Sequence, residues 1–80
     1  MTDQEMLNVI RETVCSFVAI DPEKITGDTN IRTDLGMNSL ELVNLAVAIE
    51  DAFDAEIPDR EVTGIETVDD VIRIIKEYQE

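Results

Sequence analysis

The chain has 80 residues, and its 19 Asp and Glu against 6 Lys and Arg give a net charge of −13 at pH 7. Eighty residues cannot form two independent hydrophobic cores, so we expect a single domain that spans residues 1–80. The negative charge argues against nucleic acid and an anionic membrane surface as partners, because both require a basic surface, and it favours proteins with basic patches.

The cellular location is inferred from the single cysteine and from the first residues. Cys15 has no second cysteine with which to form a disulfide within the chain. The opening MTDQEM lacks the basic and apolar regions of a secretion signal, and no apolar run approaches the ~20 residues that span a bilayer. These features predict a cytoplasmic protein, which we expect to be a monomer.

The first predicted helix begins with a capping box. Thr2 and Glu5 form the pattern T-x-x-E, in which each side chain accepts a hydrogen bond from a backbone amide at the helix start. The dipeptide DP at 21–22 ends the apolar pattern, so we expect a helix over residues 3–18. Its apolar stripe consists of Leu7, Ile10, Val14, Phe17 and Val18.

Residues 19–37 predict a long loop between the first and second helices. The segment AIDPEKITGDTNIRTDLGM contains a proline, two glycines and many Asp, Thr and Asn residues, and loops of this length tend to be functional. Apolar residues spaced along it predict that the loop is held against the core. These residues are Ile20, Ile25, Ile31 and Leu35.

Three further helices are expected after this loop. Asn38 and Glu41 repeat the capping pattern and predict a helix over residues 39–53, with a core stripe of Leu42, Leu45, Ala46, Ile49 and Phe53. A short turn of helix is expected near 59–63. A last helix opens at Thr67 and Asp70, and its stripe consists of Val68, Val71, Ile72, Ile75 and Tyr78. No segment alternates as strands do, so the sequence predicts an all-α fold, a small antiparallel bundle of three main helices and one short helix.

The second helix has a second apolar stripe away from the core stripe. Leu40, Val43 and Val47 fall on the same side as Ser39, Glu50 and Asp54, with Glu41 and Asp51 further round. One interpretation is a helix that is buried on two sides. The other is an exposed apolar strip with acidic neighbours, suited to docking on a basic surface with a hydrophobic notch, and the clustered charge favours it.

The residue types argue against intrinsic catalysis. The chain has no histidine, which excludes a Ser-His-Asp triad, and Cys15 is expected at the edge of the core rather than as a nucleophile. The loop GDTNIRTDLG lacks the spacing of a calcium loop or of a phosphate-binding motif, so we expect no metal site. Ser39 remains, with its hydroxyl at a helix start that favours an attached anion, although serine is also common there for capping alone.

The segment DLGMNSLELVNLAVAIEDAFDAEIPD, at residues 34–59, resembles the acyl carrier protein family, whose signature is a D-L-G-x-D-S-L turn that opens the second helix. The segments IDPEKIT and IETVDDVIRII also resemble that family and occur in the same order, so the likeness covers nearly the whole chain.

The resemblance implies that a phosphopantetheinyl transferase attaches 4'-phosphopantetheine from coenzyme A to Ser39, next to Asn38. The thiol of that arm would carry acyl chains as thioesters to acyl-transferring and condensing enzymes of fatty-acid, polyketide or other specialised synthesis. Such enzymes would have basic docking surfaces. The family's recognition helix maps onto Leu40, Glu41, Val43, Val47, Glu50 and Asp51.

One residue departs from the family pattern, because Asn38 stands where the family usually has Asp. Asn caps a helix as well as Asp does, but its amide oxygen is a weaker ligand for a hard cation than a carboxylate. The resemblance implies that the family's Asp helps to position the metal and the transferase during attachment of the arm. One hypothesis is therefore that Asn38 makes attachment of the arm to Ser39 slower or more selective. The alternative function is an unmodified module of the same fold that acts as a scaffold or regulator. A third function, an acidic protein that buffers metal ions, is disfavoured because the sequence lacks the spacing of metal ligands.

Overall fold

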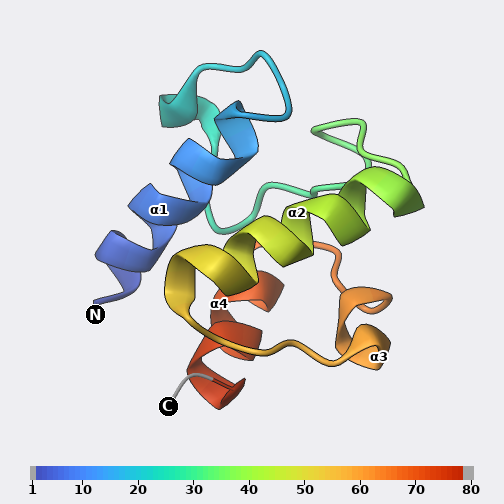
Figure 1. The fold of residues 1–80 in the computed structure, drawn as a ribbon. Helices are drawn as coiled ribbons and strands as arrows, with labels where there is room; N and C mark the ends of the chain where they lie inside the picture. Colours follow the sequence, from blue (N-terminus) through green and yellow to red (C-terminus); the bar gives the residue numbers. More distant parts are fainter. Residues whose placement is uncertain (1, 79–80) are drawn as a thin grey trace.

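The structure is a computed structural model that describes residues 2–78, and it is a bundle of helices (Figure 1). Its elements are α1 (Asp3–Cys15), the 3-10 helix η1 (Pro22–Lys24), α2 (Ser39–Phe53), α3 (Asp59–Val62) and α4 (Val68–Tyr78). Residues 2–78 form no strand, and the all-α fold class is confirmed. Within this range no helix is long and apolar enough to cross a membrane.

The helices enclose an aliphatic core. α1 packs against α2 and α4, and α3 packs against α2. Every residue predicted for the core stripe of α2 is buried, as are Ile10 and Val14 of α1 and Val68, Val71, Ile72 and Ile75 of α4. Leu7 and Tyr78 are half-buried and pack against the core. The core also contains side chains that the predicted stripes and loop positions omit, which are Met6, Met37, Ala55, Ile57, Val62, Ile65 and Ile74.

The helix α1 is shorter than predicted, because it ends at Cys15 and not at residue 18. The Ser16 hydroxyl donates to the carbonyl of Thr13 at 2.6 Å, and the Ser16 amide donates to the same carbonyl at 3.1 Å. These bonds tighten the chain into a turn, since serine side chains compete for helix carbonyls. Phe17 therefore leaves the predicted stripe and is 39% exposed, whereas Val18 stays half-buried.

The long loop of residues 19–37 is present, but it contains η1, which the sequence analysis did not predict. The Asp21 carboxylate accepts from the Glu23 amide at 2.9 Å and caps this turn, whose first residue is Pro22. Ile25, Ile31 and Leu35 are buried as predicted, and Ile20 is half-buried.

The second half of this loop is bonded to the start of α4. The amide of Ile31 donates to Glu66 O at 2.8 Å, and the amide of Val68 donates to Thr29 O at 3.1 Å. Asn30 and Thr67 form an antiparallel bridge between these bonds. The two segments are thus held side by side by backbone bonds, which fix the loop against the bundle.

Two helix starts confirm the predicted capping. The Glu5 amide donates to Thr2 Oγ1 at 3.1 Å and the Thr2 amide to Glu5 Oε1 at 3.0 Å, which completes the box at α1. At α4 the Asp70 amide donates to Thr67 Oγ1 at 3.2 Å, while Asp70 Oδ2 accepts from the amides of Thr67 and Glu66, each at 3.1 Å. These bonds satisfy amides that have no partner within their own helix.

The carboxylate of Asp70 predicts how stability changes with pH. Partial burial disfavours its charge, but the amide hydrogen bonds from Thr67 and Glu66 outweigh that effect and hold the pKa of Asp70 below its ordinary value of 3.8. Because folding favours the charged form, the stabilisation is complete above pH 3.8 and is lost as the pH falls through the lower folded-state pKa. We expect Asp70→Asn to lower the free energy of unfolding by about 1 kcal/mol at pH 7, a charge-assisted bond discounted for solvent.

Urea unfolding between neutral and acid pH checks this prediction, because the gap between wild type and Asp70→Asn should close below pH 3.8. Asp69→Asn is the control, since it removes the same charge from an exposed neighbour. Equal losses in the two variants would attribute the effect to net charge and not to the cap.

Candidate functional site

The loop before α2 is closed by Asn30. Its Oδ1 accepts from the amides of Arg32 and Thr33, both at 3.0 Å, and its own amide donates to Asp34 Oδ2 at 2.9 Å. Its carbonyl accepts from the Asp34 amide at 2.9 Å and from the Leu35 amide at 3.2 Å. The five hydrogen bonds of Asn30 thus give residues 30–35 a defined conformation, and this conformation fixes the position at which α2 starts.

Two residues then turn the chain into α2. Gly36 has a φ of +68°, in the left-handed region that glycine adopts without strain. Met37 follows, with its side chain buried and its amide donating to Ile31 O at 3.3 Å. Since Ile31 is itself bonded to the start of α4, the residue before the predicted site is tied to the core.

The predicted capping box at α2 is confirmed. The Glu41 amide donates to Asn38 Oδ1 at 2.9 Å, and the Asn38 amide donates to Glu41 Oε1 at 3.2 Å. The Leu42 amide donates to the Asn38 carbonyl at 2.9 Å. Within residues 2–78, no acceptor is found for the amides of Ser39 and Leu40, the first two of the helix.

Ser39 is therefore an exposed hydroxyl at the positive end of a fifteen-residue helix. Free amides and the helix dipole favour a negative group at this position. The described residues bring no histidine or lysine to this hydroxyl as a hydrogen-bond partner. The arrangement can hold an attached anion, but the described residues place no histidine or lysine where it could remove the proton of the serine.

The second apolar stripe of α2 lies at the surface. Leu40 is 70% exposed, Val43 48% and Val47 59%, and Phe17 is the one other large hydrophobic residue of the described chain that is exposed. The interpretation in which α2 is buried on both sides is excluded. We call Leu40, Val43 and Val47 the apolar strip.

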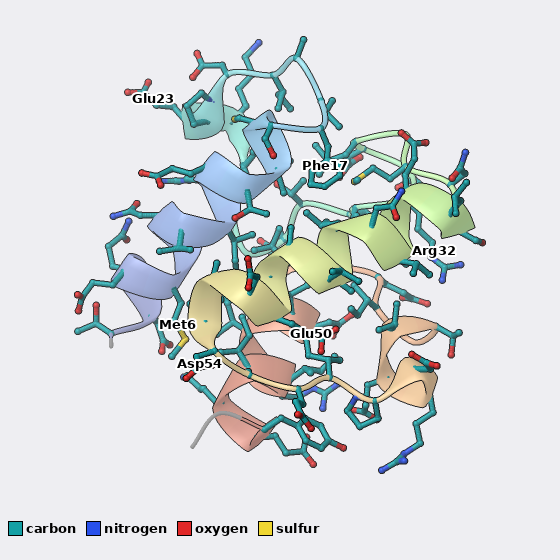
Figure 2. The ribbon with its side chains drawn as sticks, in the orientation of Figure 1. Met6, Phe17, Glu23, Arg32, Glu50 and Asp54 are labelled. Carbon is teal, nitrogen blue, oxygen red and sulfur yellow. The ribbon has the colours of Figure 1, made fainter. Side chains whose placement is uncertain are left out.

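The acidic residues beside the apolar strip differ in their roles. Glu41 is half-buried and completes the capping box. Glu50 is also half-buried, and its Oε2 accepts from the Ile57 amide at 3.2 Å, so it holds the segment between α2 and α3. Asp51 is exposed, as is Asp54, which ends α2 in the left-handed conformation (Figure 2). The capping pattern predicts the bond of Glu41, but no sequence signal indicated the bond of Glu50.

The surface is hollowed beside the apolar strip. A hollow of about 540 Å³ lies next to Val47 and is lined by Asn44, Val47, Ala48, Glu50, Asp51 and Ala55. A larger one of about 760 Å³ lies at the end of α2, between that helix and Tyr78 of α4. Both are open to solvent and have carboxylates on their walls, so they suit cationic or apolar groups of a partner and not anions.

Two further points of the sequence analysis concern Cys15 and metal ligands. Cys15 is half-buried, and its thiol donates to Ile20 O at 3.4 Å, in keeping with a residue at the edge of the core. No three His, Cys, Asp or Glu side chains between residues 2 and 78 come together as ligands of a metal ion.

Comparisons with known proteins agree with this geometry. The family model described as "Phosphopantetheine attachment site" matches residues 8–75. Acyl carrier proteins of Lactobacillus johnsonii and Lactobacillus acidophilus are each 38% identical to the chain over 79 residues, which cover 99% of both chains.

Solved structures of acyl carrier proteins have the same fold. The protein from Enterococcus faecalis superposes with a TM-score of 0.79 at 28% identity, over 96% of this chain and 98% of its own. The protein from Thermotoga maritima also has a TM-score of 0.79, at 24% identity, over 92% of this chain and 86% of its own.

The exposure of the apolar strip predicts that it contributes little to stability. We expect Val47→Lys to change the free energy of unfolding by no more than about 0.5 kcal/mol, as exposed substitutions do. Ile49→Ala, two residues away on the buried face, should lower it by about 2–5 kcal/mol. Urea unfolding of both variants checks the prediction, and a loss for Val47→Lys close to that of Ile49→Ala would show that the strip is core.

Proposed function

The chain belongs to the acyl carrier protein family, with 4'-phosphopantetheine as its prosthetic group, and on this premise we propose that Ser39 is the residue to which the group is attached. The observation that carries the proposal is the position of Ser39, exposed at the first residue of α2 beside two amides without acceptors among the described residues.

The residues around Ser39 fit a phosphodiester. The amides of Ser39 and Leu40 are available to an anion, and the dipole of α2 favours negative charge there. A Cβ added at Gly36, three residues before Ser39, would meet no atom within 4 Å beyond its chain neighbours, so the space on that side of the turn is open. Asn38 is neutral, so it adds no repulsion to a phosphate at the next residue.

The protein's own contribution is to position the Ser39 hydroxyl and to present it to partner enzymes. The bonds of Asn30 and the buried Met37 hold the Ser39 hydroxyl outward at one end of α2, and a partner enzyme must supply the base that removes its proton. When attached, the arm supplies a terminal thiol that carries acyl groups as thioesters. We propose that the protein acts in this way as a carrier and not as a catalyst.

The apolar strip is proposed as the docking surface for those enzymes, which include a phosphopantetheinyl transferase and acyl-transferring and condensing enzymes. Leu40 and Val43 begin the strip one and four residues after Ser39, about one turn of the helix, so an enzyme bound there has the arm beside it. Asp51 and Asp54 add exposed negative charge, which favours partners with basic surfaces. Tethering then gives each enzyme a high effective concentration of the acyl group.

A second candidate is a scaffold of the same fold that is never modified, and it rests on Asn38. In the structure Asn38 makes both bonds of the capping box, and Asp caps helices about as well as Asn. Since the fold accepts Asn or Asp equally at this position, the presence of Asn38 affects attachment of the arm to Ser39 and not the fold.

Loading of Ser39 tests the proposed function. Incubation with coenzyme A and a broad-specificity transferase should add the mass of one arm to the wild-type chain and none to Ser39→Ala. Ser16→Ala is the control, since Ser16 is an exposed serine at the end of α1. Intact mass spectrometry gives the readout. An unmodified wild-type chain with several transferases would favour the scaffold.

The neutral Asn38 predicts slow loading. A carboxylate at this position would bind a divalent cation beside the serine better than an amide, so Asn38→Asp should raise the loading rate by roughly three- to tenfold, an effect of about 1 kcal/mol. Asn44→Asp adds the same charge to an exposed position further along α2 and should leave the rate close to wild type. Equal rates for wild type and Asn38→Asp in timed assays would contradict the prediction.

A further inference from the structure

The residues just before α4 are held by the carboxylate of Asp70. Asp70 Oδ2 accepts from the amides of Glu66 and Thr67, each at 3.1 Å. The Asp70 amide in turn donates to Thr67 Oγ1 at 3.2 Å. One half-buried carboxylate thus fixes the direction of two successive amides at the point where the chain enters α4.

The peptide unit between Glu66 and Thr67 connects Asp70 to the loop before α2. The Thr67 amide and the Glu66 carbonyl belong to this one planar unit, so they point in opposite directions. While the amide donates to Asp70, the carbonyl accepts from the Ile31 amide at 2.8 Å. Hydrogen bonds at the two ends of one peptide unit polarise it and strengthen each other. Asp70 therefore supports the bond that holds Ile31, a fully buried residue of the loop.

Asn30 lies between two bonds from this loop to the start of α4. On one side Thr29 O accepts from the Val68 amide at 3.1 Å, and on the other side the Ile31 amide donates to Glu66 O. The hydrogen bonds of Asn30 itself give the second half of the loop its conformation. The segment that Asp70 holds therefore fixes the loop on both sides of the residue that shapes it.

Ile31 connects this region to Ser39. Its carbonyl accepts from the Met37 amide at 3.3 Å, and the Met37 side chain is buried in the core. Asn38 follows and caps α2 by accepting from the Glu41 amide at 2.9 Å. Ser39 is the next residue, so the position of its hydroxyl depends on a series of bonds that begins at Asp70.

We propose that Asp70 is a positioning residue for attachment of the arm, because it holds the support on which Ser39 stands. The inference rests on the proposed function. Within residues 2–78 the Asp70 carboxylate makes no hydrogen bond to the loop itself, so its effect passes through the backbone. A misplaced hydroxyl slows the chemical step, since a displacement of ~1 Å can cost ~100-fold in rate.

Glu5 provides a matched control at another helix. Its carboxylate also completes a capping box, by accepting from the Thr2 amide at 3.0 Å at the start of α1. Among the hydrogen bonds of residues 2–78, none joins Thr2 or Glu5 to the loop before α2. Glu5→Ala therefore removes one charge and one cap, as Asp70→Ala does, without the connection to Ser39.

The first experiment measures steady-state attachment of the arm by a broad-specificity transferase, with the carrier protein as the varied substrate, below the melting temperature of each variant. We expect Asp70→Ala to lower kcat by about threefold or more and to have the same KM as Glu5→Ala, because the apolar strip is unchanged. Loss of charge alone would raise KM equally in both variants. Asp70→Glu should restore kcat, since glutamate at this position of a capping box also accepts from the amide of the cap residue.

The amide resonances of the unmodified protein give a second readout, which does not need the arm. The amides of Ile31, Met37 and Ser39 lie along the proposed connection. Their chemical shifts should move in Asp70→Ala and stay close to wild type in Glu5→Ala. A residue that acted only on global stability would leave these shifts of the folded state unchanged.

Equal kcat values and equal amide shifts in the two alanine variants would overturn the inference. If Asp70→Ala is unfolded at the assay temperature, Asp70→Asn decides, because its neutral oxygen is a weaker acceptor than the carboxylate. A lowered kcat with displaced amide shifts would then support the inference, and wild-type values of both would overturn it. A wild-type chain that accepts no arm would contradict the proposed function, and the amide shifts would then decide the inference by themselves.

Discussion

The position of Ser39 depends on the hydrogen bonds between the loop before α2 and the start of α4. The bond from the Ile31 amide to Glu66 O and the bond from the Met37 amide to Ile31 O connect α4 to the residue before the Asn38 cap. Buried backbone groups must find partners, and here that requirement orders a loop that has little regular structure. The serine is thus held in a fixed place by its neighbours, although it is exposed and its hydroxyl makes no hydrogen bond within residues 2–78.

The helix α2 has an inner face that packs in the core and an outer face that is exposed to solvent. Its inner face, with Leu45 and Ile49 almost fully buried, supplies hydrophobic stabilisation; its outer face leaves Leu40 and Val47 largely in water. Exposed apolar side chains favour self-association, and the net charge of −13 opposes it by repulsion between copies. The acidic composition therefore allows an apolar strip to stay exposed for a partner.

The sequence was most informative where an element is determined by contacts within a few residues. The bounds of α2 follow from the Asn38 cap and the apolar spacing, and the structure agrees with both. The end of α1 was predicted too late, because the bond of the Ser16 hydroxyl to Thr13 O competes with the helix, and spacing does not show such competition. Contacts between distant segments were also beyond prediction, as with Arg32 and Thr63, which are separated by 31 residues.

The charges at the two ends of α2 bear on the proposed attachment of a phosphodiester to Ser39. A helix favours negative charge at its first turn and positive charge at its last. Here the cap Asn38 is neutral, the last turn has no basic residue, and Asp54 follows it with a negative charge. The charges at its end thus oppose the dipole, while the first two amides at its start have no acceptor in the described chain. A phosphodiester on Ser39 would add to the negative charge of Glu41 in the first turn and would give those two amides an acceptor, so the start of the helix is better matched to the attached anion than to the free hydroxyl.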